Sequence, residues 1–457
     1  MKALIYLGAL LTLAGQPALL AQSNPLIFRG RVETDNRLLL RGENEWVWNE
    51  NRLDLGIEKR ANPLRIYGNI WLRHLGPSIV ESSADLQDKG RINPIDADIR
   101  ELYAEVYGFV FDELDLRIGR QRIAWGTADM FNPTDNLNPF DLEDILDFGR
   151  RMGSDAIDLQ WHLSHQSSLQ LVYIPRFQPA SMPLGRFSDV LSVRAALPEV
   201  LAQAKYSDEI ILPNNSLSRA SSLGMRWRGF ALNTDFSLSY TYSRDPLPLP
   251  AKVSIDIIYE SDMAAGRPAV HATLIYPRHH IFGADLSGAI KRVGVWAEAA
   301  LFLPESEIVA QVELPPHQLP FPVQGEEVVL KKQTYLKFIA GADYTTTGGS
   351  YINMQYLRGF IHERGREQLA DYIFFQLNRH LFQNRLLIKP LSGGVSVSDR
   401  NSPFRNYSVF YAPEVSYLGV DNLDIGIGVY LFGGKGDGIF NNLKEMNMLR
   451  LRLTASF

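Results

Sequence analysis

The sequence contains no cysteine among its 457 residues. This absence excludes disulfides, cysteine-ligated zinc, iron–sulfur clusters and thiol nucleophiles. A strong excess of one charge is also missing. The formal net charge is only -5, so no polybasic surface for nucleic acid is indicated. Beyond its first residues the chain has no run of about 18 apolar residues, which excludes a bundle of membrane-spanning helices. The mean hydropathy of -0.11 leaves membrane-spanning strands open, because only every second residue of such a strand is apolar.

The N-terminus has the pattern of a secretory signal peptide. Lys2 precedes an apolar stretch from Leu4 to Ala14, and Ala21 is a small residue suited to cleavage. We therefore predict a signal peptide over residues 1–21 and one mature domain over residues 22–457. A short N-terminal membrane anchor is the alternative, but the apolar stretch is short for a membrane span.

Apolar and polar residues alternate through most of the mature chain, which is the period of β-strands. Between Leu64 and Arg73 the even positions are Leu, Ile or Gly, and the odd positions are Arg, Tyr, Asn or Trp. Many of these segments have charged residues in the middle of the polar face. A water-filled interior permits this and a packed core does not. The pattern predicts an all-β fold, a single antiparallel transmembrane β-barrel.

The breaks between these segments alternate between short and long. Residues 111–113 and 231–233 are short breaks, whereas residues 126–153 and 179–220 are long. Short periplasmic turns and long extracellular loops are typical of bacterial outer-membrane barrels. Counting strands with both ends periplasmic gives about eighteen. The region from Lys252 to Pro277 is read as a hairpin inside an extracellular loop, and the alternative count is about twenty.

The alternation also predicts which charged side chains line the lumen. The predicted basic residues are Arg65, Arg73, Arg117, Arg120, Arg122, Arg226, Arg228, Lys337, Arg450 and Arg452. The predicted acidic residues are Glu101, Glu105, Asp158, Asp235, Asp285, Glu298, Asp343, Glu414 and Asp424.

The block from Leu114 to Leu142 is the most specific part of the sequence. Its alternation changes phase, so we expect a β-bulge near Gly119 that turns Arg117, Arg120 and Arg122 all towards the lumen. The loop that follows, residues 127–150, is rich in carboxylates. It either folds into the lumen as a constriction or stays outside as a solvated cap. Its carboxylates are Asp129, Asp135, Asp141, Glu143, Asp144 and Asp147.

This block resembles the porin-like outer-membrane family related to the alginate-export barrels. In that family a Gly-Arg-Gln strand leads into a Trp-Gly corner and an Asn-Pro-rich loop, as residues 119–126 and 132–139 do here. The resemblance implies a monomeric barrel channel of about eighteen strands for solutes or polymers. The lumen predicted here mixes both signs of charge, whereas a polyanion exporter requires a mainly basic one.

We predict a channel for diffusion of small, anionic or polar solutes in the outer membrane of a Gram-negative bacterium, with selectivity set by lumen charges. The alternatives are an export conduit for a polysaccharide or lipid, which acts with periplasmic partners, and a closed structural or adhesive barrel. No catalysis, cofactor or metal is expected. The nearest candidate dyad, His162 with Asp158, is read as a polar lumen pair. Expected partners are outer-membrane lipid, small solutes and the barrel-assembly machinery, which would bind the C-terminal strand through Leu453 and Phe457.

Overall fold

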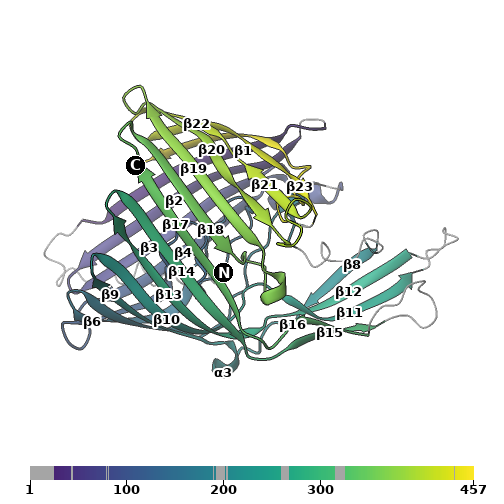
Figure 1. The fold of residues 1–457 in the computed structure, drawn as a ribbon, viewed down its shortest axis with the longest axis horizontal. Coiled ribbons are helices and arrows are strands. Elements are labelled where there is room, and N and C mark those ends of the chain that lie inside the picture. The colour runs from purple at the N-terminus through teal and green to yellow at the C-terminus, as the bar shows by residue number, and fades with distance from the viewer. Residues whose placement is uncertain are drawn as a thin grey trace.

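The computed structural model describes residues 25–42, 45–78, 80, 82–188, 190–191, 201, 204–258, 267–313, 325–436 and 438–457. The predicted signal peptide therefore lies outside the described residues. Most of the described chain forms one sheet that closes on itself (Figure 1). Its strands are β1 (Ile27–Leu39), β2 (Trp46–Ala61), β3 (Leu64–Gly76), β4 (Ile95–Val106), β5 (Leu114–Gln121), β6 (Ser154–Ser164), β7 (Ser167–Ile174), β9 (Ser222–Ala231), β10 (Thr234–Arg244), β13 (Arg278–Ile290), β14 (Val293–Pro304), β17 (Tyr335–Thr345), β18 (Ser350–Arg358), β19 (Asp371–Leu381), β20 (Leu386–Val397), β21 (Tyr407–Tyr411), β22 (Glu414–Val420), β23 (Leu423–Lys435) and β24 (Met448–Ser456).

The sheet is an antiparallel 18-strand barrel with one extra strand segment. Each strand pairs with the next one in the ring, and β1 pairs with β24 from Arg31 with Ser456 to Leu39 with Met448. The extra segment arises because β21 and β22 both pair with β20 and with β23. They form one wall strand interrupted at Ala412 and Pro413, where proline cannot donate to the ladder. The expected count of about eighteen is confirmed.

The two ends of the barrel differ. The start of β1, the end of β24 and the short turns lie at one end, here called the turn end, and the long connections lie at the other, the loop end. Leu232 and Asn233, which join β9 to β10, both have positive φ, as tight two-residue hairpin turns require. Among the described residues, no helix is long and apolar enough to cross a membrane.

Three long connections form a second sheet that projects beyond the barrel at the loop end (Figure 1). Its five strands pair with each other in the order β16 (Glu326–Leu330), β15 (Ile308–Glu313), β11 (Leu249–Ile258), β12 (Arg267–Ile275) and β8 (Lys205–Ile210). The expected hairpin within residues 252–277 is confirmed as β11 and β12. The helical segments are only a turn long: η2 (Asp85–Gln87), α2 (Lys89–Ile92), η3 (Gly185–Phe187), α3 (Leu217–Ala220) and η6 (Arg366–Gln368).

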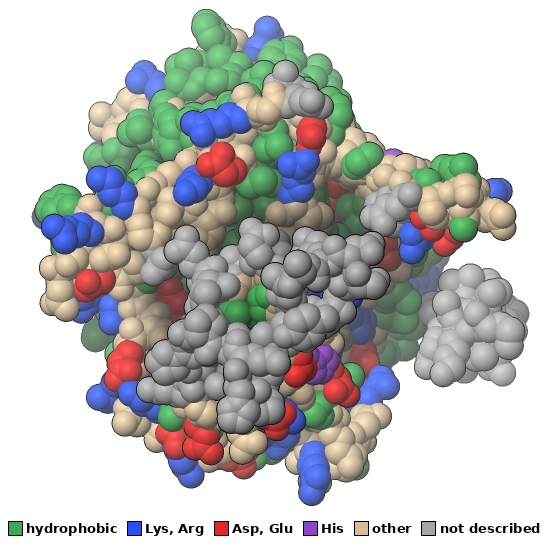
Figure 2. Space-filling model, turned by 90° about the vertical axis from the view of Figure 1, so that its right-hand side faces the viewer, with side chains coloured by type: hydrophobic (Ala, Val, Ile, Leu, Met, Phe, Trp, Pro, Cys, Tyr) green, Lys and Arg blue, Asp and Glu red, His purple; other side chains and the backbone are tan. Residues whose placement is uncertain are grey.

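The outer face of the wall is apolar and the inner face is largely charged. In β24, Leu451 is exposed on the outside, whereas Arg450 and Arg452 form ion pairs with carboxylates inside. Viewed from the loop end, hydrophobic side chains cover the upper outer wall, and charged ones gather around the rim (Figure 2). This is the arrangement of a barrel with lipid outside and polar groups inside.

Candidate functional site

The connection between β5 and β6, residues 122–153, folds into the barrel. Phe131, Leu142, Ile145 and Phe148 in this connection are buried, although the loop belongs to no strand of the wall. Of the two alternatives for the acidic loop, the structure has the one inside the lumen. We call residues 122–153 the lumen loop.

Three ion pairs fix the lumen loop to β1, β3 and β4. The guanidinium of Arg37 contacts Asp144, with Nη1 at 2.7 Å from Oδ1, and both side chains are buried. The other two pairs are Arg73 of β3 with Glu143 at 2.6 Å and Arg100 of β4 with Asp141 at 2.7 Å. Burial would raise the pKa of Asp144, but the charge and hydrogen bonds of Arg37 hold it below its usual value.

The lumen loop also contacts the opposite side of the barrel wall, where Glu298 of β14 accepts hydrogen bonds from it. Glu298 is buried, and its Oε1 accepts hydrogen bonds from the amide of Thr134 at 2.7 Å and its hydroxyl at 2.8 Å. The Oε2 atom accepts the amide of Thr127 at 3.0 Å and the side-chain amide of Asn132 at 3.2 Å. The ring order places β14 across the lumen from β1 and β3, so the loop spans the lumen.

A further contact on that side joins Asp129 to β18, whose Asn353 and Gln355 side chains donate to it at 3.0 and 3.3 Å. At the base of the loop, Arg122 pairs with Asp135 and donates to Asn138 at 2.9 Å. Asp147 lies in a turn within the loop, where its amide donates to the carbonyl of Asp144. Five of the six predicted loop carboxylates thus contact other side chains directly, and Asp147 is exposed.

The expected bulge near Gly119 is wrong. The pairing of β5 with both β4 and β6 runs through Gly119 without a register shift. The shift lies in β4, where Asn69 and Ile70 of β3 pair with Glu101 and Ile99 and leave Arg100 out of the ladder. Gly119 has a positive φ and lies so close to β4 that an added Cβ would meet the carbonyl of Leu102 at 2.4 Å.

As a consequence, the structure does not place Arg120 with Arg117 in the lumen. The unbroken alternation sets Arg120 on the outer face with the exposed Ile118, and Arg120 lies 3.7 Å from Asp155. The buried Gln121 occupies the inner face instead, where it donates to the carbonyl of Ala156 at 3.0 Å.

Most other predicted lumen charges contact neighbouring groups, some through ion pairs and some through hydrogen bonds to neutral donors. Arg65 and Arg117 both contact Glu105, and Arg450 and Arg452 both contact Glu414. Further acidic residues have the following partners: Asp424 pairs with Arg452, Asp158 accepts from Gln170, Asp285 from Ser237, Asp343 from Tyr351, and Glu101 from the amide of Arg122. Asp235 is exposed near the turn end. His162 contacts Asp115 at 3.0 Å and not Asp158.

Three predicted basic residues form no ion pair in the described part of the chain, namely Arg226, Arg228 and Lys337. Arg226 is buried and donates to the carbonyl of Ala124 at 3.3 Å, whereas Arg228 is exposed. Lys337 is buried, and its Nζ donates to the carbonyl of Phe360 at 2.7 Å. These unpaired cations all lie on the arc from β9 to β17, and the paired ones lie mainly from β24 round to β5.

Sequence analysis missed two features of the interior. One is a group of arginines around Trp71, with Arg52, Arg100 and Arg150 at 4.3, 4.1 and 5.0 Å from the ring centroid. The other is an aromatic cluster near the loop end. It includes Trp48, Phe131, Phe148, Phe360, Tyr372, Phe374, Phe432 and Phe440. The alternation of β19 could have indicated inward aromatics at Tyr372 and Phe374, but an apolar residue gives no sign of which face it takes.

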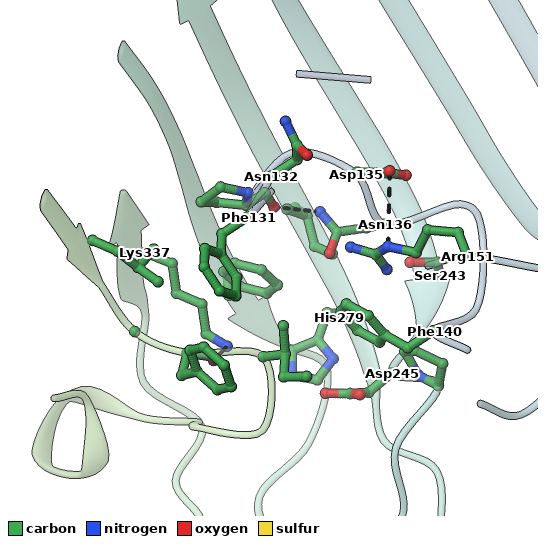
Figure 3. A pocket seen from close by; sticks show the side chains of 18 of the residues that line it. Phe131, Asn132, Asp135, Asn136, Phe140, Arg151, Ser243, Asp245, His279 and Lys337 are labelled. Atoms are coloured by element: carbon green, nitrogen blue, oxygen red, sulfur yellow. Dashed lines mark hydrogen bonds and ion pairs between the residues drawn. The ribbon is translucent and has the colours of Figure 1, made fainter. Parts of the chain in front are cut away.

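Two adjoining cavities lie beside the lumen loop. The inner one, of about 60 Å³, is lined by Phe131, His279, Phe302, Tyr335, Lys337 and Phe360, among others (Figure 3). The outer one, of about 460 Å³, is lined by Arg120, Arg176, Phe177 and Asn215, among others. Asn136, Ser243, Arg244 and Pro246 line both, so the cavities follow one another along the loop. In the described part of the chain, no group of histidines and carboxylates has the arrangement of a metal site.

A family described as "Protein of unknown function (DUF1302)" matches residues 44–347, which is more than half of the chain. The chain belongs to this family. The DUF1302 match begins at the start of β2 and ends after β17, so it includes the lumen loop and Glu298. No curated protein matches the sequence.

Several solved barrels are similar to this DUF1302 protein at low identity. They include Pseudomonas aeruginosa OccK9 (12% identity, TM-score 0.48, covering 94% of this chain and 96% of that one) and Salmonella typhi OmpF in complex with daunomycin (10%, TM-score 0.42, 94% and 97%). A mutant of the Rh. blastica porin matches at 9% identity and TM-score 0.40, covering 95% of this chain and all of that one. At such scores the barrel assignment rests on the strand pairing described above.

Proposed function

We propose that this DUF1302 protein is a porin-like channel of the bacterial outer membrane, through which small polar solutes diffuse. The observation that carries the proposal is the lumen loop, which spans a charged interior from Arg37, Arg73 and Arg100 to Glu298. A loop held at both walls narrows the passage and fixes its shape. The function needs no catalytic step, cofactor or nucleic acid.

The lumen charges support a preference for anions among these solutes. Ion pairs neutralise most of the arc from β24 to β5, so that arc contributes little net charge. Arg226, Arg228 and Lys337 on the opposite arc have no ion-pair partner in the described part of the chain, and they would attract anions. The same arc also has three carboxylates, Asp285, Glu298 and Asp343, which accept hydrogen bonds from neutral groups, so the preference depends on the positions of the cations and not on a net positive charge.

Location and orientation follow from the same chemistry. The apolar outer wall would contact outer-membrane lipid, and the turn end would face the periplasm. Phe457 extends the pairing of β24 with β1, since its amide and carbonyl both bond to Gly30 at 2.9 Å. We propose that Leu453 and Phe457 form the signal read by the barrel-assembly machinery, after cleavage of residues 1–21.

A second candidate is an export conduit for a lipid or polysaccharide that acts with periplasmic partners. The aromatic cluster favours it, because stacked rings such as Phe131 and Phe374, with centroids 4.8 Å apart, offer an apolar surface inside the barrel. A relationship to the alginate-export barrels also stays a prediction.

Conductance across planar bilayers tests the channel. Glu298→Gln replaces one acceptor oxygen by an amide NH₂ that faces the N–H groups of Thr127 and Asn132, so the loop should detach from β14. We expect a larger and noisier conductance than in the wild type. Asp235→Asn, an inward carboxylate near the turn end, is the matched control and should leave the loop unchanged. If neither the wild type nor Glu298→Gln conducts, the barrel is closed and the channel proposal is wrong.

A further inference from the structure

Lys337 is a buried cation without a counter-ion. It lies on the inner face of β17, and its ammonium has one hydrogen-bond acceptor, the carbonyl of Phe360 at 2.7 Å. The ring of Phe302 lies 5.5 Å from Nζ. No carboxylate in the described part of the chain pairs with it. An ammonium removed from water in this way costs several kcal/mol unless an anion compensates it.

The neighbouring carboxylates already form ion pairs or hydrogen bonds with other groups. Asp245 accepts two hydrogen bonds from Arg364, one of them at 2.6 Å from Nη2. Glu363 accepts the amides of Phe360 and Ala370 at 2.8 and 2.9 Å and the hydroxyl of Tyr372 at 2.6 Å. Neither carboxylate is therefore available as the partner of Lys337.

Other cations reinforce the positive charge near Lys337. Arg244 lines the same cavity and donates to two backbone carbonyls, those of Arg219 and Tyr276. Arg151 also lines it and shares a single carboxylate, Asp135, with Arg122. The cavity thus has more cations than carboxylates to neutralise them.

The inner cavity opens beside this ammonium. Figure 3 shows the Lys337 side chain extending towards His279, with the ring of Phe131 alongside. The remaining walls are mostly apolar and include Ile281, Phe302 and Leu357. A volume of about 60 Å³ is enough for a group of a few heavy atoms, but too small for a ring, since benzene occupies engineered cavities of roughly 150 Å³.

We propose that the inner cavity binds the carboxylate group of a small organic acid, with the Lys337 ammonium as its counter-ion and His279 as a neighbouring polar group. Apolar walls favour a carboxylate with a short alkyl group over a fully hydrated inorganic anion. The site identifies small organic acids as a class of solute for the proposed channel. Its role as a binding site along the permeation path rests on that proposed function. Binding itself can be measured without a membrane.

The test compares acetate with acetamide, its uncharged isostere, by ligand-observed NMR on the full-length protein in detergent. We expect the wild type to bind acetate and not acetamide. Lys337→Met keeps the length of the side chain and removes the charge, and it should weaken acetate binding at least about tenfold. This variant should fold, because replacing a buried unpaired cation by an apolar residue is neutral or stabilising.

Lys389→Met is the matched control, because Lys389 is an inward lysine paired with Glu414 at 2.8 Å and does not line the cavity. It should bind acetate as the wild type does. Equal binding of acetate by Lys337→Met would overturn the site, as would displacement of acetate by an equal concentration of chloride. Conductance without acetate binding would refute the site and leave the channel standing, whereas acetate binding by a protein that does not conduct would support the site and refute the channel.

Discussion

At the scale of single residues, we expect the ion pair of Arg37 with Asp144 to be the contact that stabilises the lumen loop most. Arg37 is the largest fully buried charged side chain, and it contacts both Asp35 and Asp144. Asp144→Asn removes one of its two counter-charges, and breaking a buried pair from one side typically costs about 3–5 kcal/mol. We expect a loss at the lower end of this range, because Asp35 remains. The urea dependence of unfolding in detergent measures it.

Asp129→Asn is the control for that variant within the same loop. Asp129 accepts hydrogen bonds from the amides of Asn353 and Gln355 and forms no ion pair within the described residues, so its loss should cost about 0.5–1.5 kcal/mol. The double variant Arg37→Met with Asp144→Leu should regain much of the loss, because no buried charge is then left unpaired. An Asp144→Asn protein as stable as Asp129→Asn would show that the pair does not anchor the loop.

At the scale of elements, the projecting sheet is a separable unit. Among the described residues, its five strands form no ladder with the barrel, and the β11 and β12 hairpin pairs Lys252 with Thr273. Replacing residues 253–272 by Asn-Gly, the usual two-residue hairpin turn, should leave the barrel stability within about 0.5 kcal/mol. Resistance of the folded barrel to SDS, read as gel mobility, checks this.

The lumen loop is the comparison for this deletion. Shortening residues 127–149 to a similar turn removes Phe131, Ile145 and Phe148 from the aromatic cluster and should lower stability by several kcal/mol. Equal effects of the two deletions would mean that the projecting sheet is part of the barrel fold.

Strands of the wall could be predicted from the sequence because the pleat and the apolar outer face impose a period of two. Local irregularities could not. The phase change around Gly119 indicated an extra residue, but the ladder stays regular there and Arg100 of β4 leaves it instead. Which of two paired strands absorbs a shift depends on contacts across the lumen, here those of Arg100 with Asp141 and the carbonyl of Arg151.

At the scale of the whole molecule, the closed ring, the strand count and the separation of turns from long loops followed from the sequence. Whether the lumen loop enters the barrel stayed open between two alternatives. A lumen loop brings its own apolar residues, and wall residues such as Tyr372 and Phe374 pack against it. An inward aromatic has the same alternation as an outward one, so only the folded loop distinguishes the two faces. The carboxylates of the loop were identified, but their partners Arg37 and Arg100 were not.

The contrast between the two faces of the wall can be tested at one depth of the membrane. Phe375 and Gln376 are neighbours in the middle of β19, and Gln376 faces inwards, where it donates to Asn378 at 3.0 Å. Phe375 therefore lies on the outer face. Phe375→Arg should cost roughly 2–4 kcal/mol for the charge in the hydrocarbon, in addition to the lost ring, whereas Gln376→Arg should change stability by less than about 1 kcal/mol.

Equilibrium unfolding of both variants in lipid vesicles gives the comparison. Phe375→Ala separates the lost ring from the added charge. If arginine were tolerated equally at both positions, the outer face would be in contact with water or protein, and the barrel would not be a membrane channel. A penalty confined to position 375 would place hydrocarbon on one side of this strand and a polar interior on the other.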